Sequence, residues 1–141
     1  MNLIQAAKDS IDALLKAACA KAIEAGELPQ GELSGTVEIP KETANGDFAG
    51  NHAMAGARAF RLAPRKIADA LIANLDLSGT WFSSVEVAGP GFINFRLAPS
   101  WYADVMKTVD AEGGKYGCVD MGRGKKLMVE FVSANPTGPM H

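Results

Sequence analysis

A nearly continuous apolar run near the C-terminal end places the strongest constraint on what this chain can form. Residues 127–132 read Leu-Met-Val-Glu-Phe-Val. A run of this kind is typical of a strand buried on both faces of a parallel sheet. Each parallel neighbour needs a crossover helix, and too few residues follow Val132 to supply one. We therefore expect the run to open a second domain that lies mostly outside these 141 residues.

A glycine-rich segment precedes the run. Residues 112–117 read Glu-Gly-Gly-Lys-Tyr-Gly, and Gly122 and Gly124 follow. Such a segment indicates a linker. The sequence thus predicts one domain over residues 1–120 and the start of another over residues 121–141.

The first domain is predicted to alternate helices with short strands. Apolar residues at helical spacing predict a helix from about residue 2 to 25, ended by Gly26. Further elements follow from periodicity and turn residues: a strand at 35–39, a loop at 41–50, two hinged helices at 51–62 and 64–75, a hairpin at 85–97 and a helix at 100–110. This order predicts an α+β fold, with a small antiparallel sheet and helices packed on one face.

Composition excludes several classes of protein. Hydrophobic residues make up 48% of the chain, enough for a core, and the formal net charge of −2 argues against a general nucleic-acid coat. Cys19 and Cys118 stand far apart, which excludes a disulfide scaffold and a zinc ribbon and predicts two buried free thiols. No metal site and no membrane segment are expected, and His52 is expected at a helix surface or half-buried.

Polar residues follow the apolar run. The segment 129–141 reads Val-Glu-Phe-Val-Ser-Ala-Asn-Pro-Thr-Gly-Pro-Met-His. In open α/β folds, ligands bind just beyond the carboxyl ends of strands. Side chains at Ser133, Asn135, Thr137 and His141 would be presented there, and Gly138 would let a ligand approach the backbone. On spacing alone, a plain connection between two elements fits the same pattern.

The whole string resembles the class I aminoacyl-tRNA synthetase signature of bacterial-type arginyl-tRNA synthetases. There it leads into a His-x-Gly-His-like element, of which this sequence supplies only His141. Three further blocks are similar to the N-terminal additional domain of that family: residues 45–54, 64–68 and 87–95. The resemblance implies a complete N-terminal domain followed by the first strand of a truncated Rossmann-like catalytic domain.

The resemblance also implies an activity for the parent enzyme. This family activates arginine with ATP, with Mg²⁺ present, and transfers it to tRNA(Arg). The expected substrate-binding residues lie in the last segment: Glu130, Ser133 and Asn135 for arginine, Thr137, Gly138 and His141 for ATP, with His141 also catalytic. The 141-residue chain alone is expected to be inactive and to hold no bound cofactor. The parent enzyme is expected to be a cytoplasmic monomer without membrane contact.

By the same resemblance, the first domain meets the D-loop side of the tRNA elbow. Phe48 is expected to stack on a base, and Asn45 or Asn51 to read the edge of that base. Each residue has a structural alternative: Phe48 as a core residue, Asn45 in an Asn-Gly turn and Asn51 as a helix N-cap. Ala49 departs from the family pattern, in which a longer polar side chain often follows the aromatic residue.

The basic residues Arg58, Arg61, Arg65 and Lys66 either meet tRNA phosphates or form a solvated helix face.

Two other hypotheses about function stay open at this point. The chain could be a free-standing RNA-binding module, which predicts a stop near residue 120. A protein-interaction domain without catalysis is the third hypothesis, and it predicts that tRNA affinity does not depend on Phe48.

Overall fold

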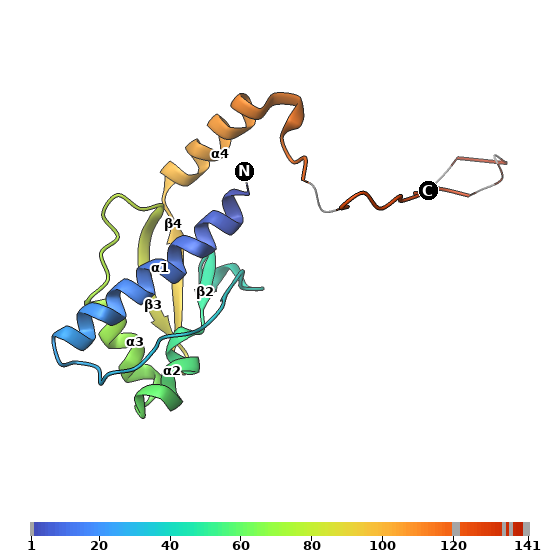
Figure 1. The fold of residues 1–141 in the computed structure, drawn as a ribbon. Helices are drawn as coiled ribbons and strands as arrows, with labels where there is room; N and C mark the ends of the chain where they lie inside the picture. Colours follow the sequence, from blue (N-terminus) through green and yellow to red (C-terminus); the bar gives the residue numbers. More distant parts are fainter. Residues whose placement is uncertain (1, 120–121, 134, 136, 140–141) are drawn as a thin grey trace.

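The fold is a four-stranded antiparallel sheet with helices over one face, seen in a computed structural model that describes residues 2–119, 122–133, 135 and 137–139. Figure 1 shows the long first helix crossing the sheet, with two shorter helices beside it and a last helix leading away from the body. The α+β class and the helices on one face agree with the prediction. In the part of the chain that the structure describes, no helix is long and apolar enough to cross a membrane.

Helix α1 spans Leu3–Glu24, close to the predicted bounds. It begins where the side-chain oxygen of Asn2 accepts a hydrogen bond from the Gln5 backbone N–H at 3.1 Å. This satisfies one of the N–H groups that the first turn leaves unpaired. The helix ends just before Gly26, whose φ of 76° suits glycine. One stripe of α1 is buried, and it includes Ile11 and Leu15 at 0% exposure.

The sheet has the strand order β1-β2-β4-β3, and every pair is antiparallel. Its strands are β1 (Val37–Glu38), β2 (Phe48–Gly50), β3 (Phe82–Ala88) and β4 (Phe92–Leu97). The hairpin β3–β4 confirms the sequence prediction. Because side chains alternate along a strand, each row of paired residues faces one side of the sheet. The row Val37, Gly50, Ile93 and Val87 faces the helices, and the next row, Glu38, Ala49, Asn94 and Glu86, faces away.

Strand β2 corrects the prediction of a loop over residues 41–50. Within that segment only Thr43–Asn45 forms a short 3-10 helix, and Phe48–Gly50 joins the centre of the sheet between β1 and β4. Three residues, two of them small, carry no period-2 signal of their own. The pairing comes from β4, more than forty positions later in the chain, so local pattern could not predict it.

Helices α2 (His52–Phe60) and α3 (Pro64–Ala73) form the predicted hinged pair. Arg61 ends α2 in the left-handed conformation, with φ 53° and ψ 37°, and Pro64 opens the first turn of α3. Fully buried side chains on these helices, among them Phe60, Ile67 and Leu71, join those of α1 in one core. Phe82 and Phe95 close that core from the sheet, with ring centroids 5.3 Å apart.

Helix α4 (Pro99–Glu112) leaves the body and has no fully buried residue. Two tryptophans anchor its first turns: Trp101 Nε1 donates to the Leu3 carbonyl at 3.4 Å, and Trp81 Nε1 donates to Asp104 at 3.0 Å. A short 3-10 helix, Gly113–Lys115, follows in the predicted linker. Cys19 is buried and burial raises the pKa of its thiol, but Cys118 is exposed, which corrects the prediction of two buried thiols.

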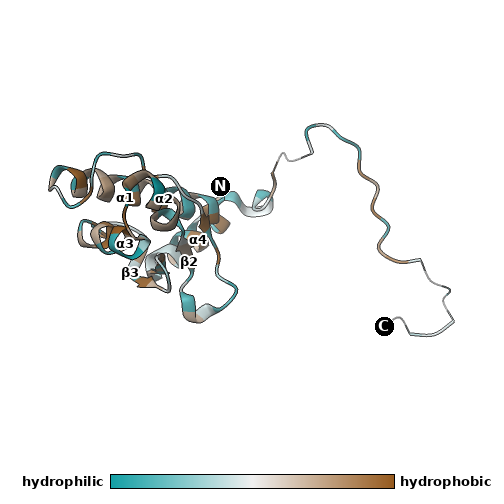
Figure 2. Ribbon diagram, turned by 90° about the horizontal axis from the view of Figure 1, so that it is seen from below, coloured by the Kyte–Doolittle hydropathy of each residue, from teal (hydrophilic) through white to brown (hydrophobic). Residues whose placement is uncertain are grey.

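The apolar run 127–132 forms no strand in this chain and is exposed throughout. Leu127 is 86% exposed, Met128 94% and Phe131 96%. Figure 2 shows this hydrophobic segment extended and away from the domain. A strand needs a hydrogen-bonded neighbour, and none of the described residues offers one to this run. Its predicted place in a second sheet stays a prediction.

Candidate functional site

An open pocket of about 430 Å³ lies on the face of the sheet that the helices leave uncovered. Three parts of the chain line it: residues 36–41 around β1, residues 45–51, and the β3–β4 hairpin. Three asparagines border this pocket, Asn45, Asn51 and Asn94. Lys41 and Glu38 contribute one charge of each sign. The structure thus brings together Asn45 and Asn51, two of the three predicted tRNA-binding residues, in what we call the asparagine pocket.

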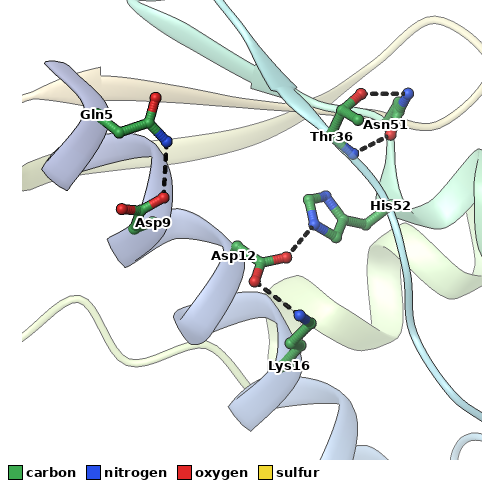
Figure 3. A network of polar contacts seen from close by, with 7 residues as sticks. All are labelled: Gln5, Asp9, Asp12, Lys16, Thr36, Asn51 and His52. Atoms are coloured by element: carbon green, nitrogen blue, oxygen red, sulfur yellow. Dashed lines mark hydrogen bonds and ion pairs between the residues drawn. The ribbon is translucent and has the colours of Figure 1, made fainter. Parts of the chain in front are cut away.

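Asn51 is held in the pocket by two hydrogen bonds to Thr36. Its Oδ1 accepts from the Thr36 backbone N–H at 2.7 Å, and its Nδ2 donates to Thr36 Oγ1 at 2.9 Å (Figure 3). Asn51 stands at the N-cap position of α2, as the structural alternative predicted, but its side chain makes no capping hydrogen bond. The side chain instead ties Thr36, the residue before β1, to the β2–α2 junction. One amide hydrogen and one oxygen lone pair remain for a ligand.

Asn45 is exposed at the end of the 3-10 helix Thr43–Asn45, and three contacts fix the segment around it. Arg96 Nη2 donates to the Ala44 carbonyl at 2.8 Å. The Asp47 backbone N–H donates to the Phe95 carbonyl at 2.9 Å, and an oxygen of the Asp47 side chain accepts from the Leu97 N–H at 2.7 Å. Gly46 passes so close to β4 that a Cβ there would lie 2.8 Å from the Phe95 carbonyl oxygen. The pocket wall is therefore built before any ligand binds.

Phe48 lies on the other face of the sheet. It is 3% exposed and belongs to the hydrophobic core. The prediction that Phe48 stacks on a base is wrong for this conformation, and the alternative, a core residue, holds. The physical reason is alternation along β2: Ala49 faces the pocket, so its neighbour Phe48 must face the helices.

Sequence reasoning missed Phe92 and Asn94, which border the pocket from β4. Alternation along the predicted hairpin does indicate the face on which these two residues lie. The predicted hairpin places Ile93, Phe95 and Leu97 on one face, so Phe92 and Asn94 must share the opposite face. Phe92 is 40% exposed, and Asn94 is only 3% exposed although it lies on the outer side.

Behind the pocket, His52 is fully buried, which corrects the expectation of a surface or half-buried residue. Its Nε2 lies 3.0 Å from Oδ1 of Asp12, and Lys16 Nζ lies 2.8 Å from the other oxygen of that carboxylate (Figure 3). The hydrogen bond from Lys16, and then that from His52, lowers the pKa of Asp12 from its usual value of 3.8. The Asp12 carboxylate can only accept, so His52 Nε2 is the donor of this hydrogen bond, and His52 Nδ1 is buried without a hydrogen-bond partner among the described residues.

The basic cluster at the α2–α3 junction is exposed. Arg65 reaches the hairpin that borders the pocket, since its Nη1 donates to the Gly89 carbonyl at 3.3 Å. Its Nε lies 3.7 Å from Asp69, which is also exposed. Arg65 thus ties α3 to the pocket's edge, and Arg58, Arg61 and Lys66 lie on the solvated side of the two helices.

The predicted arginine and ATP residues are not brought together. Glu130, Ser133, Asn135, Thr137 and Gly138 are all exposed, and His141 lies outside the described residues. The Thr137 backbone N–H donates to the Asn135 carbonyl at 2.8 Å, a local turn. Among the residues described, no group of three or more His, Cys, Asp or Glu side chains could hold a metal ion.

Comparisons with known proteins cover the whole chain. The family model described as "Arginyl tRNA synthetase N terminal domain" matches residues 8–97. An arginine–tRNA ligase of Acetivibrio thermocellus is 50% identical over 141 residues, and one of Desulforamulus reducens is 46% identical; each alignment covers 99% of this chain and 25% of the relative. The chain thus spans about a quarter of the length of these relatives.

A solved structure supports the fold. The crystal structure of arginyl-tRNA synthetase from Plasmodium falciparum superposes with a TM-score of 0.57 at 17% identity, over 72% of this chain and 18% of that one. The family-model match covers well over half of the residues of this chain, and the two curated relatives are 50% and 46% identical to it over the aligned residues. The chain belongs to the family of arginyl-tRNA synthetase N-terminal domains.

Proposed function

We propose that this chain is the N-terminal part of an arginine–tRNA ligase and that it contributes tRNA binding through the asparagine pocket. The observation that carries the proposal is the convergence of Asn45 and Asn51 on one open pocket with Lys41 at its edge. Amides offer both donors and acceptors, which suits the edges of unpaired RNA bases. A lysine beside them can meet a phosphate and position the RNA.

The charge of the chain fits a local contact rather than a broad electrostatic one. With a net charge of −2, the domain has no general attraction for a polyanion. Binding must then come from a small number of placed groups on a shaped surface. Arg65, exposed on α3, reaches the hairpin that borders the pocket and can add a phosphate contact.

The parent enzyme would activate arginine with ATP and Mg²⁺ and pass it to tRNA(Arg). Glu130, Ser133 and Asn135 would line the arginine pocket, where a carboxylate suits the guanidinium or ammonium group. Thr137, Gly138 and His141 would belong to the ATP site. These residues require the catalytic sheet around them, so the 141-residue chain should give no ATP–pyrophosphate exchange above background. We propose a cytoplasmic monomer for the parent enzyme, in line with its family.

Equilibrium binding of a tRNA(Arg) transcript tests the role of the pocket. The variants Asn45→Ala and Lys41→Gln should each weaken binding, because they remove an exposed contact without touching the core. Lys21→Gln is the matched control, since Lys21 is exposed on α1 over the opposite face. Equal loss in Lys41→Gln and Lys21→Gln would show nonspecific attraction, and no loss in either pocket variant would contradict the proposal.

A further inference from the structure

The basic cluster at the α2–α3 junction concentrates positive charge in a chain that is otherwise acidic. It consists of Arg58, Arg61, Arg65 and Lys66, and the segment 51–68 that contains them has no aspartate or glutamate. The whole chain carries a formal charge of −2, so the residues outside the cluster together carry −6, because the cluster contributes +4. An anionic partner is therefore attracted to this part of the surface and not to the rest of the chain taken as a whole.

The cluster has little neutralising charge around it. All four residues are exposed. Within the part of the chain that the structure describes, Arg58, Arg61 and Lys66 form no ion pair. Arg65 Nε lies 3.7 Å from Asp69, but both side chains are more than half exposed, so water screens this pair. The cationic groups can thus meet an anion that comes from outside.

Local structure does not explain why basic residues stand at these positions. Arg65 and Lys66 lie in the first turn of α3, where the helix dipole favours acidic side chains, and no acidic residue is present there. Arg61 has φ 53° and ψ 37°, a left-handed conformation that glycine or asparagine adopts more readily. Only Arg58, in the last turn of α2, suits its place in the helix. A role in binding explains the other three, because proteins accept local conflicts where a ligand requires them.

The start of α3 packs against the turn 89–91, which joins β3 to β4 (Figure 1). Arg65 Nη1 donates to the Gly89 carbonyl at 3.3 Å, and a Cβ on Gly91 would lie 2.9 Å from Cβ of Pro64. Gly89 and Pro90 of the same turn line the asparagine pocket. The cluster and the pocket therefore share this turn as a common border.

The composition of the cluster favours phosphate groups as its partner. Three of its four members are arginines, whose planar fork of N–H groups matches two oxygens of one phosphate. A carboxylate offers a similar pair of oxygens. An RNA backbone, however, repeats its charge at every nucleotide, so one strand can meet several members of the cluster at once.

We propose that the basic cluster binds the phosphate backbone of the RNA strand that reaches the asparagine pocket, on the helical side of the turn 89–91. This rests on the proposed function and extends it, because it adds a second contact surface on α2 and α3. Contacts of this kind position an RNA without reading its sequence.

The salt dependence of binding tests this role. The triple variant Arg58→Gln/Arg61→Asn/Lys66→Gln removes three charges from the surface and leaves the core as it is. Asparagine suits the left-handed conformation at residue 61, so the midpoint of urea unfolding should be unchanged or raised.

Each phosphate contact adds about 0.7–0.9 to the slope of log affinity against log salt concentration. The slope for a tRNA(Arg) transcript should therefore become shallower by about two to three in the triple variant. Between about 50 and 200 mM salt, the unmodified chain should lose about twentyfold to fortyfold more affinity than this variant does. An unchanged slope would overturn the inference.

A matched control removes the same charge elsewhere. Lys21→Gln/Lys107→Gln/Lys115→Gln changes exposed residues on α1, on α4 and in the 3-10 helix after α4, and it should leave the slope unaltered. An equal drop in slope for both triple variants would show general charge attraction and would overturn the inference.

Two further ligands identify the partner. A second tRNA transcript with a different elbow-loop sequence should lose affinity for the basic-cluster variant by the same factor, since phosphates carry no sequence. A loss confined to one transcript would overturn the inference. Polyglutamate of the same net charge should bind the unmodified chain much more weakly than the transcript does, and equal binding would make an acidic protein the partner instead.

Failure of this inference can be told apart from failure of the proposed function. Weaker binding by Asn45→Ala and Lys41→Gln, with unaltered binding by the basic-cluster variant, would overturn the inference and leave the proposed function intact. Absence of tRNA binding by the unmodified chain would overturn both.

Discussion

The buried imidazole of His52 is hydrogen-bonded to the carboxylate of Asp12, a residue forty positions earlier, at 3.0 Å. This contact joins α1 to the first residue of α2, directly after Asn51 in the asparagine pocket. A stable position for α2 thus depends on a polar pair behind the pocket. The pair links α1 to α2 on the side of the sheet opposite the pocket.

Acid should weaken this link. The pKa of Asp12 is lowered in the folded chain, by Lys16 first and by His52 second. A depressed pKa adds stability above the unfolded value, near 3.8, and that stability is lost as the pH falls through the lower folded value. Urea unfolding between pH 6 and pH 2 should therefore show that the unmodified chain has a higher free energy of unfolding than Asp12→Asn near pH 6. This difference should shrink below about pH 4. A constant difference across that range would contradict this account.

Gly35 should tolerate no side chain. A Cβ at Gly35 would lie 2.6 Å from Cγ of His52 and 2.7 Å from its Cα, so the backbone would have to move. Gly35→Ala should cost about 1–3 kcal/mol of unfolding free energy, the usual cost of overpacking. Gly114→Ala is the control, because nothing lies within 4 Å of a Cβ there. Chemical denaturation should show that Gly35→Ala is less stable than Gly114→Ala. Equal stability of the two variants would show that His52 can shift freely.

Asn51 should contribute to both stability and binding. Asn51→Ala removes the two hydrogen bonds to Thr36 and should lower the unfolding free energy by about 1–3 kcal/mol, at 0.5–1.5 for each bond. Asn51→Asp keeps the acceptor for the Thr36 N–H and should lose less. Calorimetric unfolding compares the three chains. A lower stability of Asn51→Asp than of Asn51→Ala would contradict the hydrogen bonds described between Asn51 and Thr36.

Phe48 should matter for folding and leave RNA binding alone. Phe48→Ala deletes a core side chain at 3% exposure and should cost about 3–5 kcal/mol. The affinity for tRNA(Arg), measured at a temperature where the variant is still folded, should equal that of the unmodified chain. Weaker binding without lower stability would place the ring against RNA after all.

Most helices and the β3–β4 hairpin follow from local signals in the sequence. Asn2 and Gly26 mark the ends of α1, Pro64 opens α3, and alternation fixes the face of each residue in β4. These features depend on neighbours in the sequence, so pattern alone predicts them. The same alternation puts Phe92 and Asn94 on the outer face of β4, but nothing local says that a pocket lies there, because the strand beside β4 is paired from far along the chain.

Non-local pairing explains what the sequence did not predict. Strand β2 exists only because β1 and β4 bind its edges, and its insertion turns Phe48 inward. His52 is buried because Asp12 meets it from another helix. In the last segment the reverse holds: residues 127–132 have the composition of a buried strand, but the neighbours that would pair with them are not among the described residues.

Nuclear magnetic resonance on the ¹⁵N-labelled chain tests the central claim most directly, since asparagine side-chain amides give their own signals. On titration with a tRNA(Arg) transcript, the amide signals of Asn45, Asn51 and Asn94 should shift together and saturate with a single dissociation constant. The amide of Asn74, which donates to Glu27 on the helical side, should stay in place. Saturation with shifts at Asn74 and none at the three pocket asparagines would contradict the claim that this pocket binds tRNA.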